Sequence, residues 1–268
     1  MAATLLVLIV AVYASVATAY VEARRRREEV PVWARIMGPI GVALHLTGLG
    51  LLAAQFGRSP FGTASEALSF LAFCLAALYL LLELSTRVPS HGGSFYWLAT
   101  ILAAVSVPGV IENAQVPPGD TPADAMRSWH VGFGLMSTAA VLVSGLLAAG
   151  YLNAYRRVKR GDIRQGKLGL SLTGFQRLAR NASLLGAVLL APSLYIGIDM
   201  IARDDAPRGL IILTAFTGVL LVLLALAWLI WWRRPLRGAT AALINVLAAV
   251  LVLIAVVVIH PLVIGGGA

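Results

Sequence analysis

Long apolar segments follow one another along almost the whole chain of 268 residues. A helix needs about 20 mostly apolar residues to cross the hydrocarbon core of a membrane. Eight segments reach that length, at about residues 2–20, 36–56, 65–84, 93–112, 129–153, 182–202, 210–232 and 239–260. Only 12% of the residues are charged, about half the share in a soluble domain. The sequence therefore predicts an all-α polytopic membrane protein with about eight transmembrane helices, forming a single domain over residues 1–268.

Basic residues collect on alternate connections between these segments. If the N-terminus lies outside, seventeen of the 21 Lys and Arg residues fall on the inner side. The four that remain outside are Arg58, Arg127, Arg203 and Arg208. The positive-inside rule then predicts that both termini lie on the outer face. The net charge of +9 therefore indicates membrane topology rather than nucleic-acid binding.

The longest polar inner connection also contains a helical pattern. At about residues 162–181, apolar residues recur at helical spacing among Arg and Lys, namely Leu168, Leu172, Phe175 and Leu178. This pattern is typical of an amphipathic helix lying on anionic lipid. The alternative is a docking site for a cytoplasmic partner.

Two of the four histidines are predicted at the same membrane depth. His130 begins the fifth apolar segment and His260 ends the eighth, and the predicted topology places both near the outer face. A bis-histidine haem takes one imidazole from each side of its iron, so this pair is a candidate set of haem ligands. The alternative is two polar residues resting at the interface. Trp129 either joins the interfacial aromatic belt or packs against the porphyrin.

His45 lies near the middle of the second apolar segment, where an ionisable residue is a functional candidate by default. Gly38, Gly41 and Gly48 share its helix face, because the four positions 38, 41, 45 and 48 are separated by three, four and three residues. Glycines there would let either a flat macrocycle or another helix approach the backbone closely. The sequence leaves both interpretations of His45 open, as a possible ligand of a metal or as a packed residue.

The remaining titratable groups point to no other chemistry. His91 belongs to a short inner connection, where we expect a solvated turn. The carboxylates Glu66, Glu83, Glu112 and Asp199 fall near the ends of apolar segments, which gives little support for a proton relay. No hydrolase or kinase motif is visible in the sequence.

Several stretches resemble one known family. "WHVGFGLMSTAAVLVSGLLAAGYL" and "RGATAALINVLAAVLVLIAVVVIHPL" resemble the two helices that carry the external histidines of the cytochrome c assembly family (CcsA, CcmC and HemX-like proteins). "LSLTGFQRLARNASLLGAVLLAPSLYIGI" is similar to the part of that family in which an amphipathic inner helix leads into a helix with a glycine near its outer end. "ALHLTGLGLL" and "ALSFLAFCLAALYLLLE" are similar to the front half of the HemX-like branch.

The resemblance implies roles for three histidines. His130 and His260 match the paired external haem ligands, and His45 matches the intramembrane histidine. Members that pass haem to apocytochrome carry a tryptophan-rich loop between the sixth and seventh helices. Here that connection reads "ARDDAPRG", without tryptophan. The departure favours the HemX-like branch, which is associated with haem biosynthesis, haem handling and control of glutamyl-tRNA reductase.

The sequence as a whole predicts a haem-binding membrane protein of the cytochrome c assembly or HemX type. It would hold or handle haem b near the outer face of a bacterial inner membrane, rather than perform bond chemistry as an enzyme. One alternative is a cytochrome b subunit that passes electrons within a larger membrane redox complex. The other is a cofactor-free regulator or scaffold whose basic inner segment anchors a cytoplasmic haem-biosynthesis enzyme.

Overall fold

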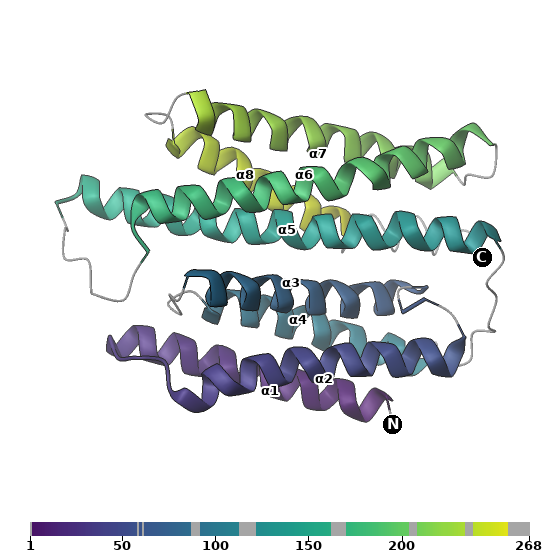
Figure 1. The fold of residues 1–268 in the computed structure, drawn as a ribbon, viewed down its shortest axis with the longest axis horizontal. Coiled ribbons are helices and arrows are strands. Elements are labelled where there is room, and N and C mark those ends of the chain that lie inside the picture. Colours follow the sequence, from purple (N-terminus) through teal and green to yellow (C-terminus); the bar gives the residue numbers. More distant parts are fainter. Residues whose placement is uncertain are drawn as a thin grey trace. The chain divides into compact units, whose positions relative to one another are not determined.

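The structure is a computed structural model that describes residues 2–57, 59–60, 62–86, 92–112, 122–161, 170–203, 208–233 and 238–256 (Figure 1). These ranges form eight α-helices and contain no strand. The helices are α1 (Ala2–Arg26), α2 (Val32–Phe56), α3 (Ala64–Thr86), α4 (Gly92–Glu112), α5 (Pro122–Lys159), α6 (Leu172–Ala202), α7 (Arg208–Arg233) and α8 (Gly238–Ile254). The predicted all-α architecture is confirmed.

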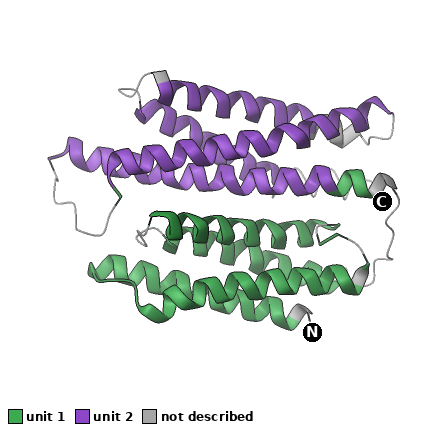
Figure 2. Cartoon of the chain, viewed as in Figure 1, with its two compact units in different colours: residues 1–128, 164–170 green, residues 129–163, 171–268 purple. Residues whose placement is uncertain are grey.

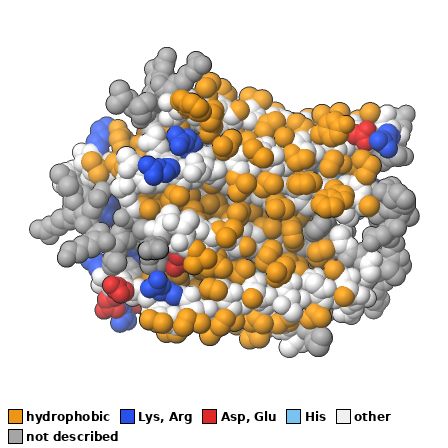
Figure 3. Space-filling model, in the orientation of Figure 1, with side chains coloured by type: hydrophobic (Ala, Val, Ile, Leu, Met, Phe, Trp, Pro, Cys, Tyr) orange, Lys and Arg blue, Asp and Glu red, His pale blue; other side chains and the backbone are white. Residues whose placement is uncertain are grey.

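Seven helices in the described part of the chain are long and apolar enough to cross a membrane. The eighth, α8, is apolar but is described over only 17 residues. Large hydrophobic side chains remain exposed along the helices, for example Leu84 of α3 and Val188 of α6. Figure 3 shows such side chains along the helices and Lys, Arg, Asp and Glu side chains near helix ends. Exposed apolar surface of this extent suits contact with lipid, as expected of an integral membrane protein.

The chain forms two compact units (Figure 2). Unit 1 consists of residues 1–128 and 164–170, and unit 2 of residues 129–163 and 171–268. The single domain expected from the sequence stays a prediction.

Glycines allow close helix packing in unit 1, where α4 packs against α1 and α3, and α2 packs against α1. A Cβ atom on Gly93, at the start of α4, would lie 2.7 Å from Cγ2 of Val21 and 3.3 Å from its backbone nitrogen. The missing side chain therefore lets the first turn of α4 touch the backbone of α1, as small residues do in membrane helix pairs.

A regular hydrogen-bonded seam joins α5 to α6 in unit 2, and Figure 1 shows the two helices side by side. The Ser137 hydroxyl donates to the carbonyl of Gly186 at 2.8 Å, and the Ser144 hydroxyl donates to the carbonyl of Ala179 at 2.9 Å. The donors advance by seven residues while the acceptors retreat by seven. That register is expected of two antiparallel helices packed along a heptad seam.

Helix α6 is longer than the sequence indicated. Its N-terminus is capped by the Ser171 hydroxyl, which accepts from the backbone N–H of Gly174 at 3.1 Å, and the helix then continues without interruption to Ala202. Residues 172–181, expected in a separate amphipathic helix, form its first turns. Phe175 is buried there against Gly150 of α5, so that part of the segment packs on protein. Residues 162–169 lie outside the described part of the chain.

Candidate functional site

His130 occupies the next heptad position of the α5–α6 seam. Its Nδ1 lies 2.8 Å from the carbonyl oxygen of Ser193, and the Ser193 hydroxyl donates back to the His130 carbonyl at 3.0 Å. A carbonyl oxygen only accepts, so Nδ1 must carry the proton. The neutral ring then has its lone pair on Nε2, which takes part in no hydrogen bond among the described residues. Metal-ligating histidines commonly have such a bond, in which the ring nitrogen that does not bind the metal donates to a carbonyl group.

A glycine of α6 lies close to the His130 ring, and a threonine of α7 lies close to the same glycine. A Cβ atom on Gly197 of α6 would lie 2.9 Å from His130 Cε1 and 3.1 Å from Thr214 Oγ1 of α7. The imidazole is 7% exposed, and its position depends on the missing side chain at residue 197. The buried Thr214 hydroxyl has no hydrogen-bond partner within the described residues. It is an orphaned polar group close to Gly197.

Trp129 does not share the burial of its neighbour. Its side chain is 65% exposed and stacks on Phe133, with ring centroids 5.9 Å apart. Both residues lie on α5 one turn apart, so the pair presents an aromatic surface at the His130 end of the helix. Such a surface is compatible with either alternative for Trp129, the interfacial aromatic belt or packing against a porphyrin.

His45 has a different environment, inside unit 1. It is 1% exposed, and both ring nitrogens are engaged. Nδ1 lies 3.3 Å from the Tyr13 hydroxyl, and Nε2 lies 3.0 Å from the Ser69 hydroxyl. Phe73 packs edge-on against the ring at 5.9 Å. In this arrangement neither nitrogen is free to bind a metal.

The glycine face around His45 is filled by protein side chains. A Cβ atom on Gly41 would lie 3.0 Å from atoms of both Tyr13 and Val12 of α1. Gly38 packs against the Tyr96 hydroxyl, and Gly48 packs against Leu5. The sequence left open whether a macrocycle or another helix packs on this face. In the structure, helix α1 and a side chain of α4 occupy it.

The other two histidines, His91 and His260, lie outside the described residues. Within the ranges that the structure describes, no three His, Cys, Asp or Glu side chains gather in a metal-binding arrangement. Of the two described histidines, His130 has a ring nitrogen without a hydrogen-bond partner among the described residues. The candidate cofactor site is therefore the region around His130.

Unit 1 contains a tyrosine cluster that was not predicted from the sequence. Its members are buried and belong to three helices: Tyr13 and Tyr20 of α1, Tyr79 of α3 and Tyr96 of α4. The Tyr20 hydroxyl donates to Glu83 of α3, at 2.7 Å to one carboxylate oxygen and 2.8 Å to the other. The seven-residue spacing of Tyr13 and Tyr20, and the four-residue spacing of Tyr79 and Glu83, place each pair on one helix face. These spacings were the only feature of the sequence that could have indicated the cluster.

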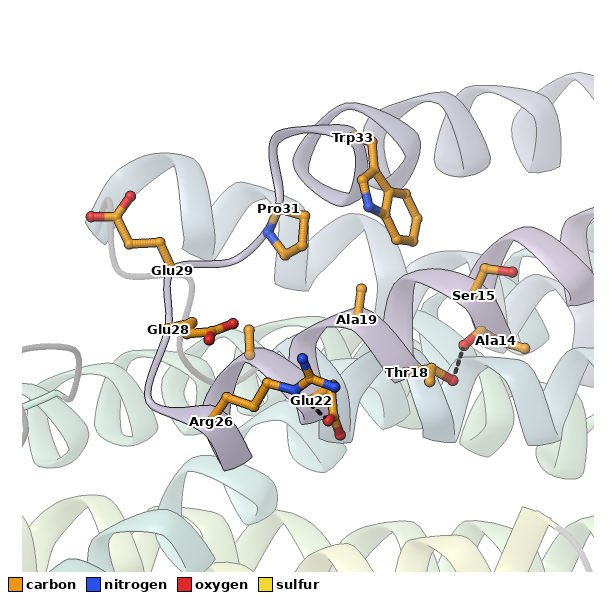
Figure 4. A pocket seen from close by; sticks show the side chains of 11 residues that line it. Ala14, Ser15, Thr18, Ala19, Glu22, Arg26, Glu28, Glu29, Pro31 and Trp33 are labelled. Atoms are coloured by element: carbon orange, nitrogen blue, oxygen red, sulfur yellow. Dashed lines mark hydrogen bonds and ion pairs between the residues drawn. The ribbon is translucent and has the colours of Figure 1, made fainter.

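A groove of about 590 Å³ lies beside the connection between α1 and α2 (Figure 4). Its lining includes Ala19 of α1 and Trp33 of α2, with Glu28 and Glu29 from the connection. Figure 4 shows the Arg26 guanidinium turned toward Glu22, 2.7 Å away. The groove contains none of the predicted site residues.

Comparison of the chain with models of protein families, with curated proteins and with solved structures finds no match.

Proposed function

We propose that the chain is a haem-binding integral membrane protein of the cytochrome c assembly or HemX-like type, which holds or handles haem b. The observation that carries this proposal is the His130 geometry. Nδ1 is held by the Ser193 carbonyl at 2.8 Å, which leaves Nε2 as the ligand nitrogen. Bound haem would supply an iron centre whose ligation and redox state can change. His130 and His260 would hold the haem iron, and Trp129 would pack beside the porphyrin.

The surroundings of His130 support this assignment over a histidine that only joins two helices. Ser137 and Ser144 make the same type of contact to α6 with a hydroxyl, so an imidazole is not required for the seam. Gly197 and the Thr214 hydroxyl, which has no hydrogen-bond partner among the described residues, further distinguish this position. Compared with a serine hydroxyl, the imidazole adds a second ring nitrogen that can bind a ligand.

The proposal includes a topology of eight membrane spans with both termini on the outer face of a bacterial inner membrane. It follows from the alternation of basic residues, seventeen of 21 on one side, and from the positive-inside rule. In that topology His130 and His260 lie at the same outer depth. Candidate partners are a cytoplasmic haem-biosynthesis enzyme, which would meet the basic inner segment, and other membrane redox subunits.

The proposal is tested by adding hemin to the detergent-purified protein and following the Soret absorbance. The wild-type chain is expected to bind one haem with the spectrum of a low-spin, six-coordinate iron. His130→Ala should reduce the affinity at least tenfold, because one axial ligand is lost, and His260→Ala should give a similar loss. Tyr195→Phe is a matched control, since Tyr195 is 74% exposed on α6 and should leave binding unchanged. Full low-spin binding by both alanine variants would overturn the assignment.

A further inference from the structure

The tyrosine cluster of unit 1 is part of a longer polar column. At one end, Glu83 accepts from Tyr20 and also contacts Tyr79. At the other end, His45 bridges the Tyr13 and Ser69 hydroxyls, at 3.3 and 3.0 Å. Ser69 and Glu83 belong to the same helix, α3, and are 14 residues apart, so the column extends about 21 Å along that helix. Glu66, buried at 2% exposure, lies one further turn along α3.

Tyr96 occupies the gap between the two hydrogen-bonded ends. Its ring lies 5.8 Å from that of Tyr20, 5.4 Å from that of Tyr79 and 5.7 Å from that of Tyr13, between centroids. The Tyr96 side chain is 0% exposed, and its hydroxyl has no hydrogen-bond partner in the described part of the chain. Tyr96 therefore contacts tyrosines of both ends.

A purely structural role does not account for Tyr96. A buried hydroxyl without a partner destabilises a fold relative to a side chain that lacks it, and phenylalanine would fill the same space. The other titratable groups near the column are Cys74, which interacts electrostatically with Tyr13, and Arg35, which interacts with Tyr20. A hydroxyl is useful at the Tyr96 position if it forms hydrogen bonds in a second conformation.

We infer that unit 1 contains a proton path along α3, from Glu83 through Tyr20, Tyr96, Tyr13 and His45 to Ser69, with Tyr96 as the element that opens or closes it. The path is interrupted at Tyr96 in the present conformation and becomes continuous when that hydroxyl pairs with its neighbours.

Each transfer along the path moves one proton and no electron. His45 accepts a proton on Nδ1 from the Tyr13 hydroxyl and gives up the proton on Nε2 to the Ser69 oxygen. Each tyrosine that donates its proton receives another from the preceding group. One proton is taken up at the Glu83 end and one is released beyond Ser69. Because the transfer leaves the His45 proton on Nδ1 instead of Nε2, a flip of the imidazole ring and rotation of the hydroxyls return the groups to their starting state before the next proton moves.

The experiment is proton flux into liposomes that contain the full chain and a trapped pH-sensitive dye, driven by a potassium gradient with valinomycin. The wild-type protein should acidify the vesicles at least tenfold faster than protein-free vesicles. Tyr96→Phe should lower this protein-dependent flux at least tenfold, whereas Tyr195→Phe should retain it. Wild-type flux equal to that of protein-free vesicles, or a Tyr96→Phe flux within twofold of wild type, would overturn the proposal.

Two further measurements separate this outcome from misfolding and from the haem proposal. Tyr96→Phe should unfold at the same temperature as the wild type or higher, because the lost hydroxyl has no partner to leave behind. If that variant fails to fold, Tyr13→Phe replaces it under the same criterion. Hemin binding should be unchanged in both variants, since His130 belongs to unit 2, so each proposal can fail without the other.

Discussion

His45 and His130 are both buried in apolar helices, but their ring nitrogens are used differently. His45 is bonded on both sides by hydroxyls from other helices, which makes it a connector in a polar column. The Nδ1 atom of His130 is bonded to a backbone carbonyl, and its Nε2 atom has no hydrogen-bond partner among the residues that the structure describes. A buried imidazole with hydrogen bonds at both ring nitrogens has no nitrogen available for a metal. An imidazole with one bonded nitrogen can still offer the other nitrogen to a ligand. Burial alone therefore does not identify a ligand histidine.

The largest stability effect should come from His45→Ala. The substitution leaves a cavity and removes the partners of the Tyr13 and Ser69 hydroxyls, so we expect a loss of about 3 kcal/mol. Thermal or detergent-induced unfolding of the purified protein measures it. Hemin binding by the folded fraction should not change. A variant that is as stable as wild type, or that loses haem while folded, would break the distinction between the two histidines.

Gly197→Ala should have the next largest effect. The added methyl group would lie 2.9 Å from His130 Cε1 and 3.1 Å from Thr214 Oγ1. Overpacking of this kind costs about 1–3 kcal/mol, and displacement of the imidazole should weaken hemin binding. Gly218→Ala on α7 is the matched control, because no atom lies within 4 Å of its added Cβ. Equal behaviour of the two variants in unfolding and hemin titration would contradict the proposed close packing at His130.

Ser193→Ala tests which group of Ser193 positions the His130 ring. The variant loses the hydroxyl bond to the His130 carbonyl, at 3.0 Å, but keeps the backbone carbonyl that holds Nδ1. We expect a loss of about 1 kcal/mol of stability and nearly normal hemin affinity. A loss of haem as large as that in His130→Ala would mean that the hydroxyl, rather than the carbonyl, positions the ring.

The smallest effect should follow from Ser183→Ala, which removes a hydroxyl bond between α6 and Asn245 of α8, 3.0 Å long. Hydrogen bonds between membrane helices contribute about 0.6 kcal/mol on average, so the change in unfolding should be of that order. Ser15→Ala is the control, because Ser15 is exposed and its hydroxyl bonds only within its own helix. A change of several kcal/mol would show that this contact stabilises the unit far more than an ordinary interhelical bond.

The helices were predictable from the sequence because lipid demands long apolar segments. Their ends were less so. Helix α6 begins at Leu172, although its charged first turns indicated a separate element, because Phe175 finds a packing partner in Gly150. Helix α5 extends to Lys159, beyond the apolar segment that ended near residue 153, since polar residues such as Asn153 and Arg156 do not break a helix.

The candidate sites were predictable only in part. The sequence singled out His130 and His45 but did not indicate how their ring nitrogens are bonded, because Ser193, Tyr13 and Ser69 lie far from them in the chain. The same holds for the tyrosine column. Its members come from three helices, and periodicity within one helix carries no information about which face another helix will meet.

Haem ligation by His130 is best tested by the dithionite-reduced absorption spectrum of haem-loaded protein, compared between His130→Gln and His45→Gln. Glutamine keeps a polar side chain at both positions but removes the imidazole. We expect the sharp reduced α-band of a bis-histidine haem b in wild type and His45→Gln and its loss in His130→Gln. An α-band that persists in His130→Gln, or that disappears in a folded His45→Gln protein, would contradict this expectation.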